Sequence, residues 1–162
     1  LEEEYDVILI DTGGGIAEYV IDFAANANDM LVLISPEPTS IMDAYALIKV
    51  STARGGNVRV NLIASQINSV KEGRETLNRL KFAVNKFLDI KVNTLGAIFF
   101  DKNVINAVKR RNPFILEYPG TIASVCVRNI AKRIVSNNSD AVSSKRVSFF
   151  GRIFNSIMEN VS

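Results

Sequence analysis

The sequence contains no histidine, no tryptophan and a single cysteine, Cys126. One cysteine cannot form a disulfide within the chain, and without histidine the usual Cys/His zinc site is excluded. A catalytic triad that depends on histidine is excluded for the same reason. Acid–base chemistry would therefore fall to carboxylates, lysine or tyrosine, or to a bound nucleotide and its metal ion.

Long apolar runs are also missing from the sequence. No run approaches the roughly 18–20 residues that a helix needs to cross a bilayer. The opening Leu-Glu-Glu-Glu does not have the character of a signal peptide. Because the first residue is not methionine and an expected strand follows almost at once, we interpret the chain as a fragment that lacks its N-terminal part.

Outside the C-terminal end, the chain has no excess of positive or negative charge. The 162 residues carry 19 Lys and Arg against 17 Asp and Glu, a net charge of +2. Residues 143–162 hold three basic residues and one acidic residue, so they account for the whole excess. A neutral body argues against a dedicated nucleic-acid binder, whereas a basic end fits contact with an anionic surface.

Apolar runs and helical periodicities alternate along the chain, which is long enough for one domain. We expect strands at 5–10, 30–35, 58–65 and 94–100, and helices at 16–26, 40–52, 69–88, 103–110 and 122–135. Four-residue patterns at 40–43 and 69–72 have the form of capping boxes. This alternation predicts an α/β fold, with a parallel β-sheet flanked by helices and ligands at the carboxyl ends of the strands.

The first strand end has the form of a Walker B element. Ile8-Leu9-Ile10 leads into Asp11, and Thr12 is followed by Gly13, Gly14 and Gly15. A carboxylate at a strand end can hold Mg²⁺ beside the phosphates of a nucleotide. Glycines there permit close approach of the backbone to a γ-phosphate. An ordinary turn after a strand gives the same local pattern, so both interpretations stay open.

The lysine-containing phosphate loop of P-loop ATPases, Gly-x-x-x-x-Gly-Lys-[Ser/Thr], is absent. The chain alone is therefore expected to bind ATP poorly. The second strand end, Ser-Pro-Glu-Pro-Thr-Ser at 35–40, fits a proline-rich loop with a helix cap. It fits equally a rigid loop beside a nucleotide or a dimer partner, with Glu37 and Asp43 as its carboxylates.

The C-terminal residues 145–161 follow a polar linker at 136–144 and have the spacing of an amphipathic helix. Apolar residues on one side and basic residues near the start are typical of a helix that lies in a membrane interface. The alternative is a terminal helix packed on its own core or on a partner subunit. The residues expected to meet the membrane are Lys145, Arg146, Phe149, Phe150, Arg152, Ile153, Phe154 and Ile157.

A second group of basic residues lies on the last two helices of the body. Such groups are most often solvated helix faces, and the alternative is a docking patch for an acidic partner or DNA. The group comprises Lys109, Arg110, Arg111, Arg128, Lys132 and Arg133.

Two stretches together resemble the MinD/ParA class of P-loop ATPases. They are Asp-Val-Ile-Leu-Ile-Asp-Thr-Gly-Gly-Gly-Ile at 6–16 and Pro-Glu-Pro-Thr-Ser-Ile-Met-Asp-Ala-Tyr-Ala-Leu-Ile-Lys at 36–49. The second is most similar to the branch that regulates flagellar number (FlhG, FleN or YlxH). The resemblance covers residues 4–135 and includes Lys-Glu-Gly-Arg at 71–74, Leu-Gly-Ala-Ile at 95–98, Asn-Pro-Phe at 112–114 and Tyr-Pro at 118–119.

The resemblance implies a homodimer with ATP and Mg²⁺ between its subunits. Asp11 would be the catalytic Walker B carboxylate and Mg²⁺ ligand, and Gly13, Gly14 and Gly15 would sense the γ-phosphate. Pro36 and Glu37 would lie near the nucleotide. Ser65 stands where the family often has an adenine-reading asparagine, with Asn68 three residues further on. Ile-Phe-Phe-Asp at 98–101 replaces the family's Ile-Pro-x-Asp.

The resulting hypothesis is the C-terminal part of a membrane-associating ATPase that regulates the number or placement of flagella. Residues 1–135 would be the ATPase portion, 136–144 the linker and 145–161 the helix that binds the anionic inner face of the bacterial cell membrane. The family implies a flagellar GTPase, C-ring proteins or a flagellar transcription regulator as partners. From the neutral charge of the body we expect no direct nucleic-acid contact. The alternatives are a nucleotide-free binding module that docks through its tail, and a MinD- or ParA-type positioning ATPase.

Overall fold

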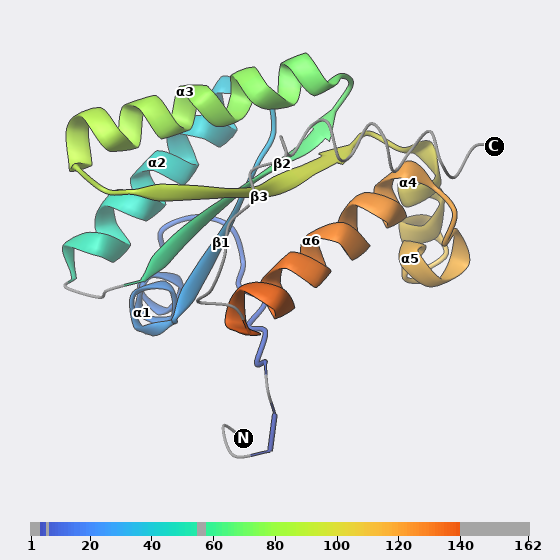
Figure 1. Ribbon diagram of the computed structural model, residues 1–162, viewed down its shortest axis with the longest axis horizontal. Coiled ribbons are helices and arrows are strands. Elements are labelled where there is room, and N and C mark those ends of the chain that lie inside the picture. Colours follow the sequence, from blue (N-terminus) through green and yellow to red (C-terminus); the bar gives the residue numbers. More distant parts are fainter. Residues whose placement is uncertain (1–3, 6, 55–57, 140–162) are drawn as a thin grey trace.

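The protein is described by a computed structural model that places residues 4–5, 7–54 and 58–139 (Figure 1). Three strands, β1 (Asp29–Ile34), β2 (Arg59–Ile67) and β3 (Val92–Phe99), form a parallel sheet in the order β1-β2-β3. The connections between them contain α2 (Pro38–Ala53) and α3 (Val70–Leu88). The predicted α/β fold, a parallel sheet flanked by helices, is confirmed.

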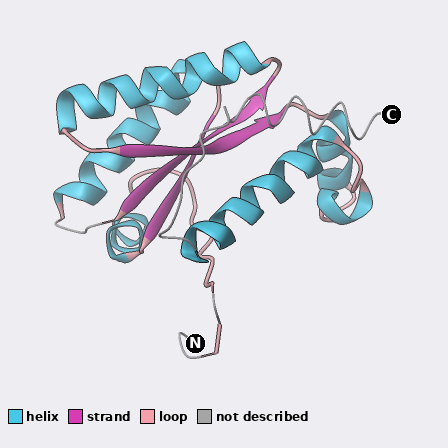
Figure 2. Ribbon diagram, viewed as in Figure 1, coloured by secondary structure: helices cyan, strands magenta, loops and turns pink. Residues whose placement is uncertain are grey.

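The helices form layers on the two faces of the sheet (Figure 2). Helices α2 and α3 cover one face, and α6 (Ile122–Ser139) lies on the other face against β3. Helix α1 (Glu18–Asn26) packs on α2. The short helices α4 (Lys102–Lys109) and α5 (Phe114–Glu117) make a corner beyond the carboxyl end of β3. The sequence pattern did not predict α5.

The main core lies between the sheet and the α2–α3 layer. Alternate residues of β1 point into it, including Val32 and Ile34, and they meet Ile48 of α2 and Leu80 of α3. A smaller cluster on the opposite face contains Ile63 and Leu95 together with Ile130 of α6. The central strand β2 is therefore buried on both faces, and residues 60–64 in its middle are all buried.

A bulge interrupts the alternation near the end of β2. The register with β3 shifts between Ala64 and Ile67, and Gln66 adopts the left-handed conformation with φ of 58°. As a result Ile67 joins the same core cluster as Ala64, although it lies three positions further along the strand, where regular alternation would point it to the other face. The Ile67 carbonyl accepts a hydrogen bond from the Phe100 N–H at 2.9 Å, so the strand remains paired beyond the bulge.

The strand predicted at 5–10 is not formed, which corrects the four-strand expectation. Residues 7–10 have no regular secondary structure, and Leu9 is 78% exposed. A strand needs a neighbour to satisfy its backbone hydrogen bonds, and within the described residues none of β1, β2 and β3 pairs with this segment. We call residues 7–17 the N-terminal arm; all of them are exposed.

The two predicted capping boxes have different outcomes. At the start of α3, Ser69 Oγ accepts from the Glu72 N–H at 3.1 Å, and Glu72 accepts from the Asn68 N–H at 2.6 Å. The box predicted at 40–43 is wrong, because α2 already begins at Pro38, a residue suited to the first turn of a helix. Ser40 Oγ instead accepts from the Ser35 N–H at 3.0 Å and holds the loop against the helix.

Candidate functional site

The carboxyl ends of the three strands meet at one edge of the sheet, because the strands are parallel. Each end leads into the N-terminus of a helix, α2, α3 or α4. Helix N-termini present unpaired N–H groups and a partial positive charge, which suits anionic ligands such as phosphates. This carboxyl edge is therefore the candidate site for the predicted nucleotide contacts at 36–37 and 65–68.

The β1 end places Pro36 and Glu37 directly before α2. Glu37 occupies the N-cap position, its side chain makes no capping hydrogen bond, and it is exposed. The loop itself is fixed by the Ser35–Ser40 hydrogen bond. The structure thus places Glu37 on a rigid turn at the carboxyl edge, where it was expected.

The β2 end places Ser65 beside the bulge and Asn68 just beyond it. Ser65 is half-buried and Asn68 is exposed. The Asn68 backbone and side-chain amides both donate to Glu72 Oε2, at 2.6 and 3.2 Å. The Asn68 side chain therefore helps to start α3, a structural role that its spacing alone did not reveal.

The β3 end carries a cap in place of the expected family loop. The Asp101 carboxylate accepts from the Asn103 N–H at 2.9 Å and so begins α4. Phe100 is 46% exposed at the same turn. The Phe-Phe-Asp sequence thus makes an ordinary helix start, and it presents an aromatic ring at the carboxyl edge.

Asp11, Gly13, Gly14 and Gly15 lie in the N-terminal arm, and all four are exposed. Figure 1 shows the arm leaving the body on the side of α1, away from the strand ends that lead into α3 and α4. Gly15 has φ of +98°, a conformation that favours glycine. The structure therefore does not bring these residues together with the carboxyl edge.

The positions of these residues decide whether the described part of the chain can hold the expected Mg²⁺ and ATP. Among the residues that the structure describes, no three His, Cys, Asp or Glu side chains are grouped so as to hold a metal ion. Asp11 is outside the sheet that would fix it at a strand end. The described residues do not fit a complete Mg²⁺–nucleotide site, and we assign no step of hydrolysis to them.

Three residues of the basic group on the last helices are used inside the molecule. Arg110 forms an ion pair with Glu117 at 2.7 Å, and this hydrogen bond raises the pKa of the Arg110 guanidinium. Arg128 donates to the Pro119 carbonyl and Arg133 to the Leu95 carbonyl, each at 2.5 Å. They tie together the segments of the α4–α6 corner and the edge of β3, which favours the structural interpretation of this group.

Two features of the sequence remain, the single cysteine and the predicted tail helix. Cys126 is 2% exposed, and burial raises the pKa of its thiol, so it is not suited to act as a nucleophile. The linker predicted at 136–144 is wrong at its start, because residues 136–139 continue α6. The rest of the linker and the tail residues 145–161 lie outside the described residues. Within residues 4–139, wherever the structure describes them, no helix combines the length and apolar character needed to cross a membrane.

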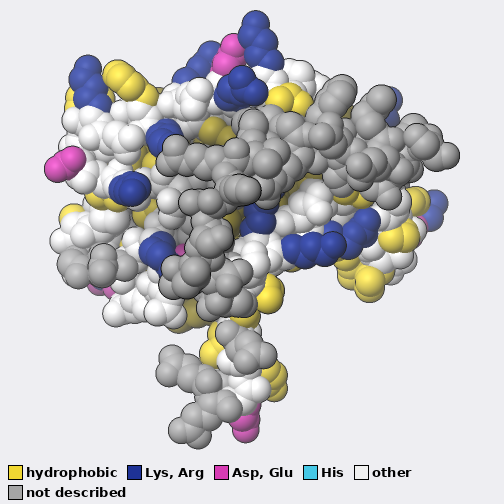
Figure 3. Space-filling view, viewed as in Figure 1, with side chains coloured by type: hydrophobic (Ala, Val, Ile, Leu, Met, Phe, Trp, Pro, Cys, Tyr) yellow, Lys and Arg dark blue, Asp and Glu magenta, His cyan; other side chains and the backbone are white. Residues whose placement is uncertain are grey.

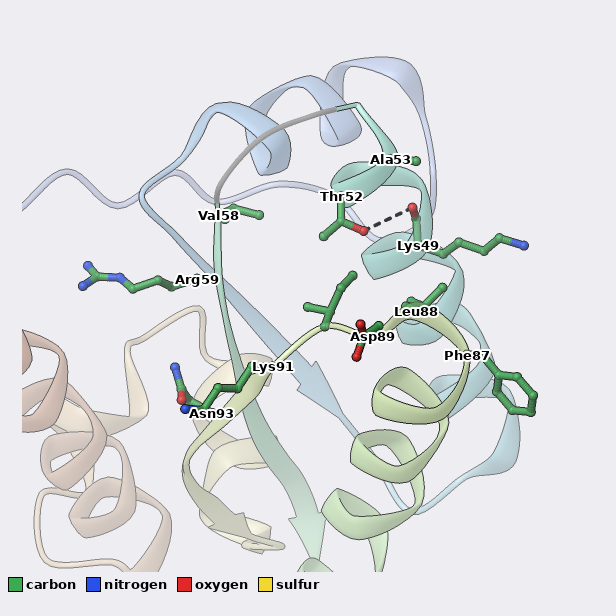
Figure 4. Close-up of a pocket in the computed structure, with 11 residues that line it drawn as sticks. Lys49, Thr52, Ala53, Val58, Arg59, Phe87, Leu88, Asp89, Lys91 and Asn93 are labelled. Carbon is green, nitrogen blue, oxygen red and sulfur yellow. Dashed lines mark hydrogen bonds between the residues drawn. The ribbon is translucent and has the colours of Figure 1, made fainter.

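Sequence reasoning missed a hollow at the opposite, amino edge of the sheet (Figure 4). Its volume is about 860 Å³, and it lies between the C-terminal ends of α2 and α3 and the starts of β2 and β3. Lys49, Arg59, Phe87 and Lys91 are among its lining residues. No motif pointed here, because these residues come from four separate segments and only the fold brings them together.

Comparison with known proteins relates the chain to curated bacterial regulators. No family model matches it. It is 32% identical over 136 residues to the antiactivator FleN of Pseudomonas aeruginosa, which covers 84% of this chain and 49% of FleN. It is 35% identical over 133 residues to the flagellum site-determining protein YlxH of Helicobacter pylori, with coverage of 81% and 44%.

A third relative is the septum site-determining protein MinD of Bacillus subtilis. It is 25% identical over 139 residues, which cover 85% of this chain and 50% of that MinD. The chain thus spans about half the length of the curated relatives that it matches. The resemblance to the MinD/ParA class, and to its FlhG, FleN and YlxH branch, is confirmed.

Proposed function

We propose that this chain, which belongs by sequence with the MinD/ParA class, is part of a MinD-like ATPase that regulates the number or placement of flagella. Similarity to FleN and YlxH across more than four fifths of the chain carries this proposal. The parallel sheet, with three helix N-termini at its carboxyl edge, supports it, since that edge suits a phosphate-containing ligand.

Binding of Mg²⁺ and ATP belongs to the proposal as a property of the whole protein. Asp11 would supply the metal-binding carboxylate, and Gly13, Gly14 and Gly15 would approach the γ-phosphate. Pro36, Glu37 and Ser65 would border the nucleotide in a homodimer, and their positions at the carboxyl edge support this part. The 162 residues contain no phosphate loop, so we expect this chain alone to be inactive.

Attachment to the inner face of the cell membrane would come from the tail. The apolar side of residues 145–161 would enter the headgroup–acyl boundary, and Lys145, Arg146 and Arg152 would face anionic headgroups. The partners of the whole protein would be a flagellar GTPase, C-ring proteins or a flagellar transcription regulator. The name of YlxH, a flagellum site-determining protein, supports a flagellar role for such an assembly.

The test uses the full-length protein that contains this chain, with Asp11→Ala as the variant. We expect Asp11→Ala to abolish ATP hydrolysis and ATP-dependent sedimentation with anionic vesicles. Glu75→Ala, which removes an exposed carboxylate on α3, serves as the matched control and should retain both. Unchanged hydrolysis in Asp11→Ala would reject the role of Asp11, and a normal number of flagella after gene deletion would reject the regulatory role.

A second candidate is a nucleotide-free binding module that docks to a membrane or protein partner through its tail. One observation favours it: the described residues assemble no complete Mg²⁺–nucleotide site. Vesicle sedimentation that depends on residues 143–162 but not on ATP would support this module. Sedimentation that requires ATP in the longer protein would support the ATP-driven switch.

A further inference from the structure

Two phenylalanines stand exposed on the C-terminal half of α3, on the outside of the molecule. Phe82 is 65% exposed and Phe87 is 66% exposed. The Lys86 ammonium lies between them, 5.5 Å from the centre of the Phe82 ring and 5.3 Å from that of Phe87. The three side chains therefore form one continuous surface, in which a cation is held against two aromatic rings.

The surroundings of this surface are mainly basic, with one carboxylate, Asp89, at the end of the helix. Between Glu75 and Asp89 the helix carries Arg79, Lys81 and Lys86 and no acidic residue. Lysines near a helix C-terminus are favoured by the helix dipole, but the dipole does not account for exposed phenylalanines beside them. Figure 3 shows basic and apolar side chains next to each other over the C-terminal end of α3.

Helix α2 adds a further cation at the same place. Lys49 and Phe87 both line the hollow at the amino edge. In Figure 4 both side chains point outward on one side of the hollow, whereas Arg59, Lys91 and Asn93 lie on the other side. We call Lys49, Phe82, Lys86 and Phe87 the basic–aromatic corner.

The position of the corner relates it to the tail. Helix α3 ends at Leu88 and α6 ends at Ser139. Helix α6 starts beside α5, at the carboxyl end of β3, and runs along β3 toward the opposite, amino edge of the sheet (Figure 1). The described part of α6 therefore ends toward the amino edge, the edge at which the basic–aromatic corner lies, although the two are on opposite faces of the sheet.

We propose that the basic–aromatic corner is a second contact with an anionic membrane, in addition to the tail. The two phenylalanines would enter the boundary between headgroups and acyl chains, while Lys49 and Lys86 would face the phosphates of the headgroups. The proposal rests on the proposed membrane association. It would orient the amino edge toward the lipid and leave the carboxyl edge free for its own ligands.

A lipid surface fits the corner better than single-stranded nucleic acid does. Proteins that bind single-stranded nucleic acid stack its bases on the open faces of aromatic rings. Here Lys86 lies against both rings. Insertion of phenyl rings among lipids requires apolar bulk with cations beside it, which this surface provides. Binding of an oligonucleotide is kept as an outcome that would overturn the proposal.

The absence of tryptophan makes a direct experiment possible, because one introduced tryptophan is then the sole indole emitter. We would prepare the full chain as Phe87→Trp, Phe150→Trp or Val108→Trp. Val108 is 68% exposed on α4 at the carboxyl edge and is the matched control. Each would be titrated with vesicles of phosphatidylcholine alone and of phosphatidylcholine with phosphatidylglycerol, while the wavelength of emission is followed.

We expect a blue shift and quenching by lipid-borne bromine for Phe87→Trp with the anionic vesicles, and neither for Val108→Trp. Adding Lys86→Gln to Phe87→Trp should weaken the titration about fivefold, the effect of one lysine at an anionic surface. A blue shift in Phe150→Trp without one in Phe87→Trp would overturn the proposed membrane contact of the basic–aromatic corner, and it would leave the proposed role of the tail intact. No shift in either would overturn both.

The remaining outcomes are equally decisive. A shift in Phe87→Trp without one in Phe150→Trp would support the corner and reject the tail as the membrane anchor. Equal shifts in Phe87→Trp and Val108→Trp would indicate nonspecific adsorption and would overturn the proposal. A stronger response of Phe87→Trp to an oligonucleotide than to anionic vesicles would also overturn it.

Discussion

Residues 7–10 and strand β1 are both short apolar runs, yet only β1 becomes a strand. In β1 every residue from Asp29 to Ile34 faces a residue of β2, and Ile34 is completely buried. In the arm, Leu9 is 78% exposed and its backbone pairs with none of the described strands. Composition therefore makes a strand possible, but a strand forms only where the chain pairs with a neighbour; among the described residues the outer edges of β1 and β3 are open, and the arm pairs with neither.

The same contrast separates the body from the arm in packing. Side chains in the body are fixed by contacts from several elements, whereas side chains of the arm are exposed throughout. A substitution of the same chemical type should therefore have very different effects in the two regions. This difference can be measured by pairing each body variant with a variant of the arm, or of a less constrained site.

The largest difference should come from truncating a leucine. Leu80 of α3 is completely buried in the main core, so Leu80→Ala should lower the free energy of unfolding by about 2–5 kcal/mol. Leu9→Ala in the arm should change it by less than about 0.5 kcal/mol. Urea unfolding followed by circular dichroism measures both, and a similar loss in the two variants would show that the arm is packed in solution.

Adding a methyl group should give the next largest effect. A Cβ at Gly73 would lie 2.7 Å from Ile67 Cδ1, whereas a Cβ at Gly14 would meet no atom within 4 Å. Overpacking costs about 1–3 kcal/mol, and alanine regains about 1 kcal/mol over glycine in a helix. We therefore expect Gly73→Ala to lose up to about 2 kcal/mol in urea unfolding and Gly14→Ala to lose nothing; a stable Gly73→Ala would mean that Ile67 is free to move.

Removing the cap of α3 should have a smaller effect. Ser69→Ala deletes the hydroxyl that accepts from the Glu72 N–H, and the loss of such a cap costs about 1 kcal/mol. Glu37→Ala is the control, because the Glu37 side chain makes no capping bond at the start of α2. Thermal unfolding of the two variants compares a helix start that depends on its cap with one that begins at proline, and equal losses would contradict this distinction.

The smallest effect should be a gain. Ser51 is completely buried in α2, and its hydroxyl has no hydrogen-bond partner among the described residues. Ser51→Ala removes a desolvated polar group and should raise the free energy of unfolding by up to about 1 kcal/mol. Ser40→Ala, which deletes a bonded hydroxyl, should lower it instead. A loss of stability in Ser51→Ala would indicate a bound water at this position.

The sequence was informative where local chemistry decides the structure. The β2 run, the α3 periodicity and the capping box at Ser69 predicted their elements closely, because each depends on neighbouring residues. The exposed arm could not be predicted, since pairing with another strand is a tertiary contact that the run itself does not specify. The second role of Asn68 and the surface around Lys86 could not be predicted either, because tertiary contacts create them.

The bulge at Gln66 inserts one extra residue into β2 and so reverses the alternation of side chains between the two faces of the sheet beyond it. Before it, every second residue faces α2 and α3; after it, Ile67 takes that face one position out of phase. Deletion of Gln66 would leave Ile67 on this face in the regular phase, but it would draw Ile67 one residue back along the strand and so displace it from Gly73, which its side chain now closely approaches. The length of this strand end is therefore set by the fit between β2 and α3, so the segment should tolerate replacement of residues far better than a change in their number.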